Sequence, residues 1–543
     1  MYILTSDSRS AEFLPFSRAV TCKAHYMQTF AQSMNQKVIS FLSSSRLSWI
    51  IIAFGILIRL VQYLYNRSLW ADEAVLALNI VNRSYLELLQ PLDYDQAAPI
   101  GFLIVEKIAV QLFGDNEYSL RLFPLVFGII SLLLFFHLAK RCIPKTAIPI
   151  ALALFATLPY LVYYACEVKQ YSTDVAIALL SCLVAMQLSS PKLNFTQTVT
   201  LSLMGAIAIW FSHPAIFVLA GVGITSLLIG SASNKNLKIN NLIVFLTWLL
   251  SFTGMYFGFL RHLNSDEDLL QSWGQAFPSS PFDIIWLFDA FGKFFYKPLG
   301  FSKVIDAIDG FAFVDGIAIF AFVIGCVSCF YRRKDILAIL LSPLIVTFVA
   351  AYLHKYPFRS RLVLFLTTFI ILLIAEGVNF LIKKNRYAVN LVGVLILALL
   401  LANPLYNTSI SIFNPYLKEE IKHVMSYVKA RQQPGDVLYV FQRGRYQFQY
   451  YAKKYGYQDG DYIIGVEDLD KYDGKTVSPE EEKRYKSDLD KLRGNKRVWL
   501  IFSHADKAQE IDLINAHINK IGKQIDIYST KGAFVYLYDF SSE

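Results

Sequence analysis

Long apolar segments recur along the chain and restrict it to a small set of folds. A helix needs about 20 apolar residues to cross a bilayer core of about 30 Å, and about eleven segments approach that length. With 55% hydrophobic and only 17% charged residues, the chain has more apolar surface than one soluble core can hold. It is predicted to be a polytopic α-helical membrane protein. The candidate spans are 47–65, 118–138, 147–164, 172–188, 197–211, 214–230, 240–260, 311–330, 336–353, 362–382 and 388–405.

Lysine and arginine gather in the loops on alternate sides of these spans, and the positive-inside rule places such loops in the cytoplasm. The net charge of +9 therefore indicates topology rather than nucleic-acid binding. The basic segment 1–46 shares the cytoplasmic side, and no cleavable signal peptide is evident, so 47–64 is expected to be a signal anchor. The basic loop residues are Lys140, Arg141, Lys145, Lys192, Lys235, Lys238, Arg332, Arg333, Lys334, Lys383, Lys384 and Arg386.

Three parts of the chain are then expected outside the cytoplasm: 66–117, 261–310 and everything after 406. The transmembrane domain is 47–406, and its first outer loop, 66–117, contains a predicted helix over 71–89 and an apolar stretch, 100–113, that is too short for a span. We expect 100–113 to lie in the membrane interface. An odd number of spans also leaves the C-terminal segment outside.

The C-terminal segment, 407–543, has the composition of a soluble α/β domain of ordinary size. Residues 418–431 have helical periodicity, and four β-rich runs follow at 437–441, 462–466, 498–502 and 534–538. Because the chain shows neither a disulfide pattern nor eukaryotic sorting signals, a bacterial inner membrane is the expected location, with this domain on the periplasmic side.

The first candidate site is the pair Asp72 and Glu73, just outside the first span in Trp70-Ala71-Asp72-Glu73-Ala74. A carboxylate there can act as a general base. The same pair can instead complement a helix dipole at its N-terminal turn, and the five residues alone leave both interpretations open. A second acidic turn, Asp93-Tyr94-Asp95-Gln96-Ala97-Ala98-Pro99, follows, and Arg121 opens the second span in Arg121-Leu122-Phe123-Pro124.

The order of these motifs resembles the GT-C class of polytopic glycosyltransferases, particularly the bacterial relatives of protein O-mannosyltransferases and of lipid A aminoarabinose transferases. The resemblance spans about residues 47–380, and the chain departs from it where Ala98-Pro99 replaces a frequent Pro-Pro. It implies that Asp72 is the catalytic base and Glu73 its neighbour, that the sugar donor is a polyprenyl-phosphate sugar, and that the anomeric carbon is inverted. Asp174 matches an acidic residue at the start of the family's fourth span.

The second candidate site is the seam between the third and fourth predicted spans. Glu167, Lys169, Tyr171 and Asp174 crowd this outer turn, and charged groups at membrane depth are costly and usually functional. We expect them to contact sugar or phosphate. Glu167 and Lys169 could equally pair with each other or extend to the interface, and this alternative stays open.

The third candidate site is the turn His354-Lys355-Tyr356-Pro357-Phe358-Arg359-Ser360-Arg361, which carries three cations on the outer side, against the positive-inside bias. Lys355, Arg359 and Arg361 suit a departing polyprenyl phosphate. Contact with anionic headgroups is the alternative. His213, beside Pro214 in the hairpin between the fifth and sixth spans, is interpreted as part of a turn.

The sequence therefore predicts a hexosyl- or pentosyltransferase in which Asp72 deprotonates an acceptor hydroxyl and cations stabilise the leaving phosphate. Arg121, Lys355, Arg359 and Arg361 are expected to bind the phosphate, and Asp95 and Asp174 to shape the sugar or acceptor pocket. The acceptor is expected to be a lipid, a glycan or a protein of the cell envelope. No nucleotide is needed, because the donor is already a lipid. A divalent cation beside Asp72 and Glu73 is compatible with the carboxylates, although no His or Cys supports one and carboxylates alone do not demand it. A transporter or lipid flippase is the alternative class.

Overall fold

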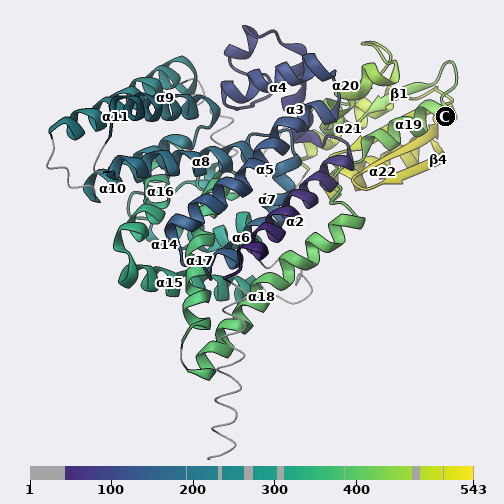
Figure 1. Cartoon of the computed structure of the whole chain (residues 1–543). Coiled ribbons are helices and arrows are strands. Elements are labelled where there is room, and N and C mark those ends of the chain that lie inside the picture. Colours follow the sequence, from purple (N-terminus) through teal and green to yellow (C-terminus); the bar gives the residue numbers. More distant parts are fainter. Residues whose placement is uncertain are drawn as a thin grey trace, which may run out of the picture.

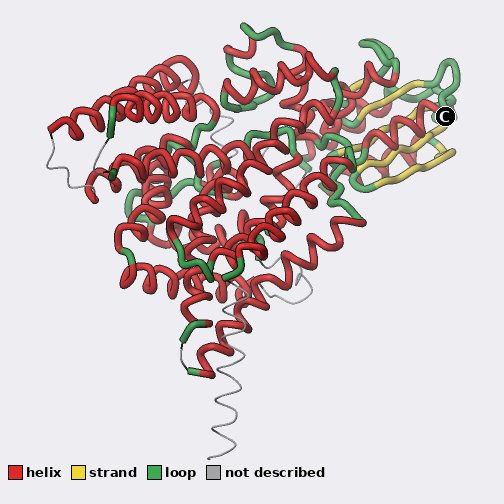
Figure 2. The backbone as a smooth tube through the Cα atoms, in the orientation of Figure 1, coloured by secondary structure: helices red, strands yellow, loops and turns green. Residues whose placement is uncertain are grey.

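The computed structural model describes residues 43–190, 193–229, 235–261, 273–301, 311–384, 386–467, 477–505 and 507–541 (Figure 1). Most of the predicted cytoplasmic segment 1–46, together with Lys192, lies outside these residues. Helices form a large body, and strands are confined to one end of the molecule (Figure 2).

The helical body confirms the predicted membrane fold. Eight helical segments of the described chain are long and apolar enough to cross a membrane, and a ninth is bent by 60° between α6 and α7. Together with the shorter helices α9 and α10, they account for every predicted span. The helices are α2 (Ser45–Leu64), α5 (Glu117–Cys142), α6 (Ile148–Thr157), α7 (Pro159–Tyr163) with η2 (Tyr164–Cys166), α8 (Tyr171–Ala185) with η3 (Met186–Ser189), α9 (Phe195–Phe211), α10 (Ala215–Ile229), α11 (Lys235–Met255) with η4 (Tyr256–Leu260), α15 (Phe311–Arg332), α16 (Lys334–Tyr352), η7 (Ser360–Leu366) with α17 (Thr367–Ile382), and α18 (Tyr387–Phe413).

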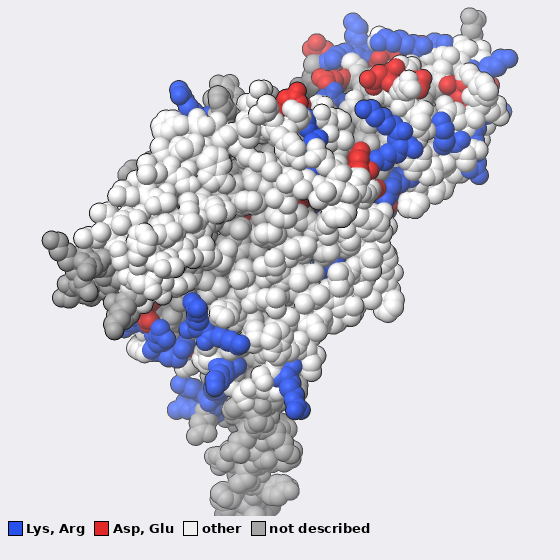
Figure 3. All heavy atoms as spheres, turned by 45° about the horizontal axis from the view of Figure 1, so that its top comes forward, with Lys and Arg blue, Asp and Glu red and all other residues white. Residues whose placement is uncertain are grey.

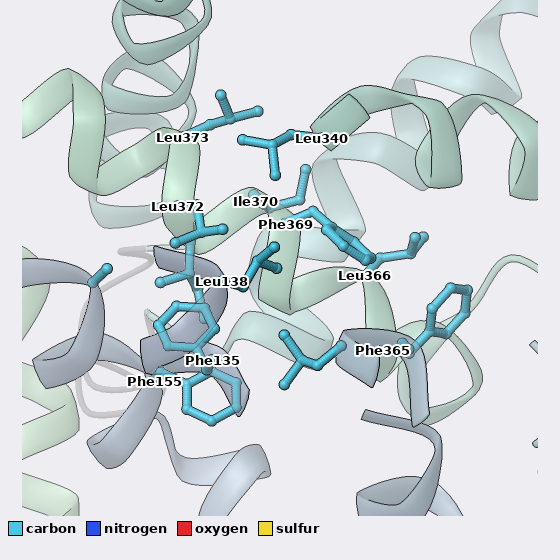
Figure 4. Packing of buried hydrophobic residues seen from close by; sticks show 14 of the residues in the cluster. Phe135, Leu138, Phe155, Leu340, Phe365, Leu366, Phe369, Ile370, Leu372 and Leu373 are labelled. Carbon is cyan, nitrogen blue, oxygen red and sulfur yellow. The ribbon is translucent and has the colours of Figure 1, made fainter. Parts of the chain in front are cut away.

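Close helix packing at two glycines organises this body. A Cβ on Gly325 of α15 would lie 1.8 Å from the backbone oxygen of Leu373, and one on Gly377 of α17 would lie 1.9 Å from that of Ala321. Small residues at membrane helix interfaces allow such backbone approach. The span formed by η7 and α17 is almost wholly buried inside the bundle. Its apolar side chains belong to the same buried cluster as Phe135 and Phe155 (Figure 4).

The first outer loop contributes two helices that cover the end of the body next to the C-terminal domain (Figure 1). Helix α4 (Ile100–Phe113) has the predicted bounds. The predicted helix 71–89 is shorter, because α3 (Ala71–Asn82) stops at Arg83 and only the turn η1 (Glu87–Leu89) follows. Arg83 leaves the helical conformation and its side chain binds Asp93 and the carbonyls of Glu87 and Pro91, which folds the chain back.

The C-terminal domain contains a five-stranded mixed sheet in the order β2-β1-β3-β5-β4. The four predicted strands are present; β4 was missed because its Lys, Gln, Asp, Ser and Thr residues interrupt the apolar pattern. Strands β1, β2 and β3 are parallel, and β5 is antiparallel to β3 and β4. The elements are α19 (Ile421–Arg431), β1 (Val437–Val440), η8 (Gln442–Gly444), α20 (Arg445–Ala452), η9 (Lys453–Tyr455), β2 (Ile463–Ile464), α21 (Pro479–Asp490), β3 (Val498–Ser503), α22 (Ala508–Ile521), β4 (Lys523–Thr530) and β5 (Ala533–Asp539).

Charged residues gather at the two ends of the molecule. On the face shown in Figure 3, lysine and arginine gather at the end of the helical body away from the C-terminal domain, and both signs of charge cover that domain. A broad, nearly uncharged surface lies between them. This is the distribution expected of a bilayer-embedded protein with one basic end.

Candidate active site

A pocket of about 450 Å³ is lined by segments that are far apart in the sequence. Three of these segments carry predicted site residues: the first outer loop, the turn before α8 with the start of that helix, and the turn between α16 and η7. The turn between α9 and α10 and the end of α11 with η4 also line the pocket. The turn η5 (Gly274–Ala276) and helix α14 (Ile284–Phe294) with η6 (Phe295–Leu299) lie near the turn between α16 and η7. The predicted site residues that line the pocket are Asp72, Asp95, Lys169, Tyr171, Asp174, Lys355 and Arg361. The three predicted sites are therefore one site.

Asp72 forms ion pairs with a cation from each of the other two segments. Its Oδ1 lies 2.9 Å from Lys169 Nζ, and its Oδ2 lies 3.0 Å from Arg361 Nη1. Burial alone would raise the pKa of Asp72, but Lys169 and Arg361 outweigh it and hold that pKa below its usual range. The carboxylate is thus ionised and ready to accept a proton once a competing anion engages the cations.

Aromatic rings fix the Arg361 guanidinium in place. Its Cζ lies 6.0 Å from the ring centre of Trp70, 5.7 Å from that of Tyr171 and 5.9 Å from that of Trp273. Cation–π contacts of this length stabilise a cation that is partly removed from water. Tyr171, which we expected to contact sugar or phosphate, therefore also holds Arg361 in place.

Glu73 and Arg121 form a different kind of pair, on another side of α3. Both side chains are buried, and Arg121 binds Glu73 in a fork, with Nε 3.0 Å from Oε1 and Nη2 2.7 Å from Oε2. Arg121 also donates to the carbonyls of Arg67 and Ser68, and Glu73 accepts from the Val168 amide. Neither Glu73 nor Arg121 lines the pocket, and their donors and acceptors are already used, so the geometry does not support the expected phosphate contact of Arg121 or a direct catalytic role for Glu73.

Glu167 is buried behind the pocket rather than in it. Its Oε1 accepts a hydrogen bond of 2.6 Å from Trp70 Nε1, and burial raises its pKa. Lys418, which the sequence did not single out, lies 3.9 Å from this carboxylate and 3.1 Å from the centre of the Trp70 ring. Burial lowers the pKa of Lys418 to about 8. Glu167 thus supports Trp70, and no pattern near Lys418 could have indicated its distant partners.

Residues of the outer turns complete the pocket wall. Lys169 also donates to Gln96 Oε1 at 2.6 Å, which ties the second acidic turn to Asp72. Within that turn, Tyr94 and Asp95 both have positive φ, 65° and 54°, a strained conformation that functional sites often hold. His213, interpreted from sequence as part of a turn, lines the pocket as well, and desolvation lowers its pKa to about 4.

Polar atoms without partners face this pocket. In the described part of the chain, Gln170 Oε1, Asp174 Oδ1 and Arg361 Nε are buried without a hydrogen-bond partner, and all three residues line the pocket. Such atoms cost free energy unless a ligand or water satisfies them. Arg359, in contrast, is exposed, binds Gln275 Oε1 at 2.9 Å and does not line the pocket, so its expected phosphate contact is not supported.

Comparison with known proteins finds a family match over part of the chain. Residues 97–256 match the sequence model of the dolichyl-phosphate-mannose-protein mannosyltransferase family, a range that contains Lys169 and Asp174 but neither Asp72 nor Arg361. The predicted resemblance to GT-C membrane glycosyltransferases is confirmed. No match was found among curated protein sequences.

Solved structures with a related arrangement include two GT-C enzymes. The oligosaccharyltransferase AglB from Archaeoglobus fulgidus, in complex with an inhibitory peptide and a dolichol-phosphate, has 11% identity over 90% of this chain and 74% of its own, with a TM-score of 0.47. ArnT from Cupriavidus metallidurans has 13% identity over 91% of this chain and 98% of its own in the apo state, with a TM-score of 0.36. A second ArnT structure, bound to undecaprenyl phosphate, has a TM-score of 0.35; it has 13% identity over 90% of this chain and 98% of its own.

The carboxylates of this site do not fit a divalent cation. Asp72 faces two cations, and Glu73 is saturated by Arg121 and the Val168 amide. The two neighbours therefore do not share one ligand position, and Lys169 and Arg361 would repel a metal ion beside Asp72. Among the described residues, no group of three or more His, Cys, Asp or Glu side chains is placed to hold a metal.

Proposed function

We propose that this protein is a membrane glycosyltransferase that moves a sugar from a polyprenyl-phosphate donor to an acceptor hydroxyl, with inversion at the anomeric carbon. One observation carries the proposal: the Asp72 carboxylate is paired with two cations in a pocket where Gln170, Asp174 and Arg361 each have a buried polar atom without a hydrogen-bond partner. The donor class is supported by the family match, whose members are described as using dolichyl-phosphate mannose. No step requires a nucleotide.

The chemistry is a single displacement. Asp72 accepts the proton of the acceptor hydroxyl as its oxygen attacks the anomeric carbon, and the bond from that carbon to the phosphate oxygen breaks. The polyprenyl phosphate leaves with the bonding electrons and an added negative charge. Lys169 and Arg361 stabilise that charge, with Lys355 at the pocket wall as a third cation.

The ion pairs of Asp72 suggest that the donor binds first. In the absence of a donor, Lys169 and Arg361 neutralise the carboxylate and hold its pKa low, which makes it a weak base. A donor phosphate competes for the same two cations. As they turn toward the phosphate, the pKa of Asp72 rises, and the base becomes effective only when a sugar is in place.

The membrane placement follows from charge. We infer that the basic end of the body faces the cytoplasm of a bacterial inner membrane and that the pocket and the C-terminal domain face the periplasm. A donor with an isoprenoid tail would then reach the pocket from the bilayer. Its acceptor would be a lipid, glycan or protein of the cell envelope.

The test is sugar release from a panel of radiolabelled polyprenyl-phosphate sugars by the purified full-length chain in nanodiscs. The native protein is compared with Asp72→Asn, which removes the base, and with Asp289→Asn, the same change at an exposed residue of α14 that does not line the pocket. Turnover by the native protein and Asp289→Asn but not by Asp72→Asn would establish both the enzyme class and the base. If an active panel is left unconsumed by all three proteins, transport becomes the better explanation.

A further inference from the structure

The C-terminal domain binds the chain segment that precedes the catalytic aspartate. Gln447 Nε2 donates to the Leu69 carbonyl at 2.9 Å, and the Leu69 amide donates to the Tyr451 hydroxyl at 2.8 Å. Lys422 Nζ donates to the Asn66 carbonyl at 2.6 Å. Helix α20 packs directly against α3, as Figure 1 shows. The domain therefore holds the backbone of this segment rather than only covering it.

Two neighbouring glutamates between α18 and α19 form further hydrogen bonds to this segment, as far as the first residue of α3. Glu420 accepts from the Ser68 amide and hydroxyl, the latter at 2.9 Å. Glu419 Oε2 accepts from the Ala71 amide at 2.9 Å, and its Oε1 lies 2.8 Å from His504 Nδ1. Both carboxylates are buried. Glu419 thus binds the residue immediately before Asp72.

The segment that carries these glutamates is itself fixed to the sheet. The Glu420 amide donates to the Lys531 carbonyl at 2.9 Å, in the turn between β4 and β5. In that turn Gly532 has φ of 67°, and a Cβ there would lie 1.9 Å from the Lys418 carbonyl oxygen. The backbones can approach this closely only because the residue is glycine. The position of Glu419 is therefore set by the C-terminal domain.

Asp72 and its two cations belong to different parts of the molecule. Lys169 and Arg361 stand at the outer ends of helices in the membrane body, whereas the start of α3 is held by the C-terminal domain. We propose that Glu419 is a positioning residue, which fixes the first turn of α3 so that Asp72 meets Lys169, Arg361 and the acceptor hydroxyl. This inference rests on the proposed function. A displacement of about 1 Å at a reacting group can cost about 100-fold in rate.

The experiment compares four full-length proteins in nanodiscs: native, Glu419→Ala, Glu419→Gln and Glu510→Gln. Glu510 is a matched control, because it is a buried glutamate of the same domain, paired with Arg443, that does not touch the segment 66–71. Two measurements are made on each protein. Steady-state kinetics with the donor consumed by the native protein give kcat and donor KM, and mass spectrometry gives the hydrogen exchange of the amides of residues 68–74.

Glu419→Ala is expected to lower kcat about 10- to 100-fold, as loss of a supporting hydrogen bond does at other sites. Donor KM should stay unchanged, because Lys169 and Arg361 are intact, and exchange should speed up at the start of α3. Glu419→Gln should recover most of the rate, since its amide oxygen accepts the same Ala71 N–H. Glu510→Gln should change neither the kinetic constants nor the hydrogen exchange.

A Glu419→Ala protein with the kcat and exchange of Glu510→Gln would overturn the positioning role while leaving the proposed function intact. Failure of the native protein to use any donor would instead count against the proposed function, and the exchange measurement would still decide whether Glu419 fixes α3. If Glu419→Ala is not recovered folded, Glu419→Asp, whose shorter side chain withdraws the carboxylate from Ala71, gives the same test.

Discussion

Two neighbouring carboxylates of helix α3, Asp72 and Glu73, lie on different faces of the helix and in different surroundings. On one face of α3, Asp72 meets Lys169 and Arg361 at the edge of a pocket, with single contacts of 2.9 and 3.0 Å. On the other, Glu73 binds Arg121 in a fully buried fork. Residues adjacent in a helix point about 100° apart, so adjacency in sequence gives no common environment.

The difference shows what separates a reactive ion pair from a structural one. Glu73 and Arg121 leave few of their donors and acceptors unused, so a ligand would gain little by displacing either. The Asp72 group keeps Arg361 Nε without a partner in the described chain and opens to a cavity, so a phosphate can take over its cations. An ion pair that can be exchanged is expected to affect turnover, and one that cannot is expected to affect folding.

The strongest test of this contrast is the Asp72→Asn variant. We expect kcat to fall about 100- to 10,000-fold, the usual contribution of a general base. The lowered pKa of Asp72 means that its charge also stabilises the fold. Because its two cations open to the pocket, the thermal unfolding midpoint in detergent should nevertheless fall less than in Glu73→Gln. Residual turnover within threefold of native would contradict the assignment, and a large loss of stability would place Asp72 with Glu73 as a structural residue.

Glu73→Gln should give the opposite pattern. Removing one partner of a buried ion pair leaves Arg121 uncompensated and costs about 3–5 kcal/mol. The free energy of unfolding is measured by denaturant titration of the protein in detergent. Glu87→Gln is the control, because this exposed glutamate of the same loop should shift it by less than about 0.5 kcal/mol. A stable Glu73→Gln protein with abolished turnover would mean that Glu73 takes part in the chemistry.

Arg361→Gln is expected to weaken donor binding. The loss of a charged hydrogen bond of about 1.5–3 kcal/mol corresponds to roughly a 10- to 100-fold rise in donor KM. Arg359→Gln provides the comparison two residues away, since that side chain is exposed and outside the pocket. Steady-state kinetics over a range of donor concentrations distinguishes the two. Equal effects of both changes would indicate a diffuse basic surface that contacts headgroups rather than a defined phosphate site.

The sequence predicted the membrane architecture well because spans are decided locally. A bilayer requires every span to be long and apolar, and that property is visible in 47–65 or 388–405 without knowledge of their neighbours. The strand β4 lacked such a local signal, because Lys, Gln, Asp, Ser and Thr occupy five of its eight positions.

The sequence located the site, but it did not separate the residues that line the pocket from the buried structural ones. The motifs around Asp72, Lys169 and Arg361 were each found, and the structure joins them. The residue roles that the sequence did not assign depend on long-range contacts. Arg121 binds Glu73, 48 positions away, and Lys418 of the C-terminal domain contacts the Trp70 ring. One sequence holds no information on such pairings, so a buried structural arginine and a phosphate-binding one look alike.

The smallest expected effect lies at Glu167, which stands between the two faces. Its raised pKa means that the folded protein binds more protons than the unfolded one between the ordinary pKa of glutamate, about 4.3, and the raised value. Stability from this group is therefore lost as pH rises through that window.

Glu167→Gln should remove this loss, and its amide oxygen can still accept the Trp70 N–H. The free energy of unfolding should therefore rise by about 0.5–2 kcal/mol at neutral pH. Unfolding of both proteins is followed from pH 4 to pH 7, below the pKa of about 8 at which Lys418 loses its proton. The difference in stability should grow with pH; a constant difference would show that the charge of Glu167 is matched by Lys418, which would make this pair a structural one like Glu73 and Arg121.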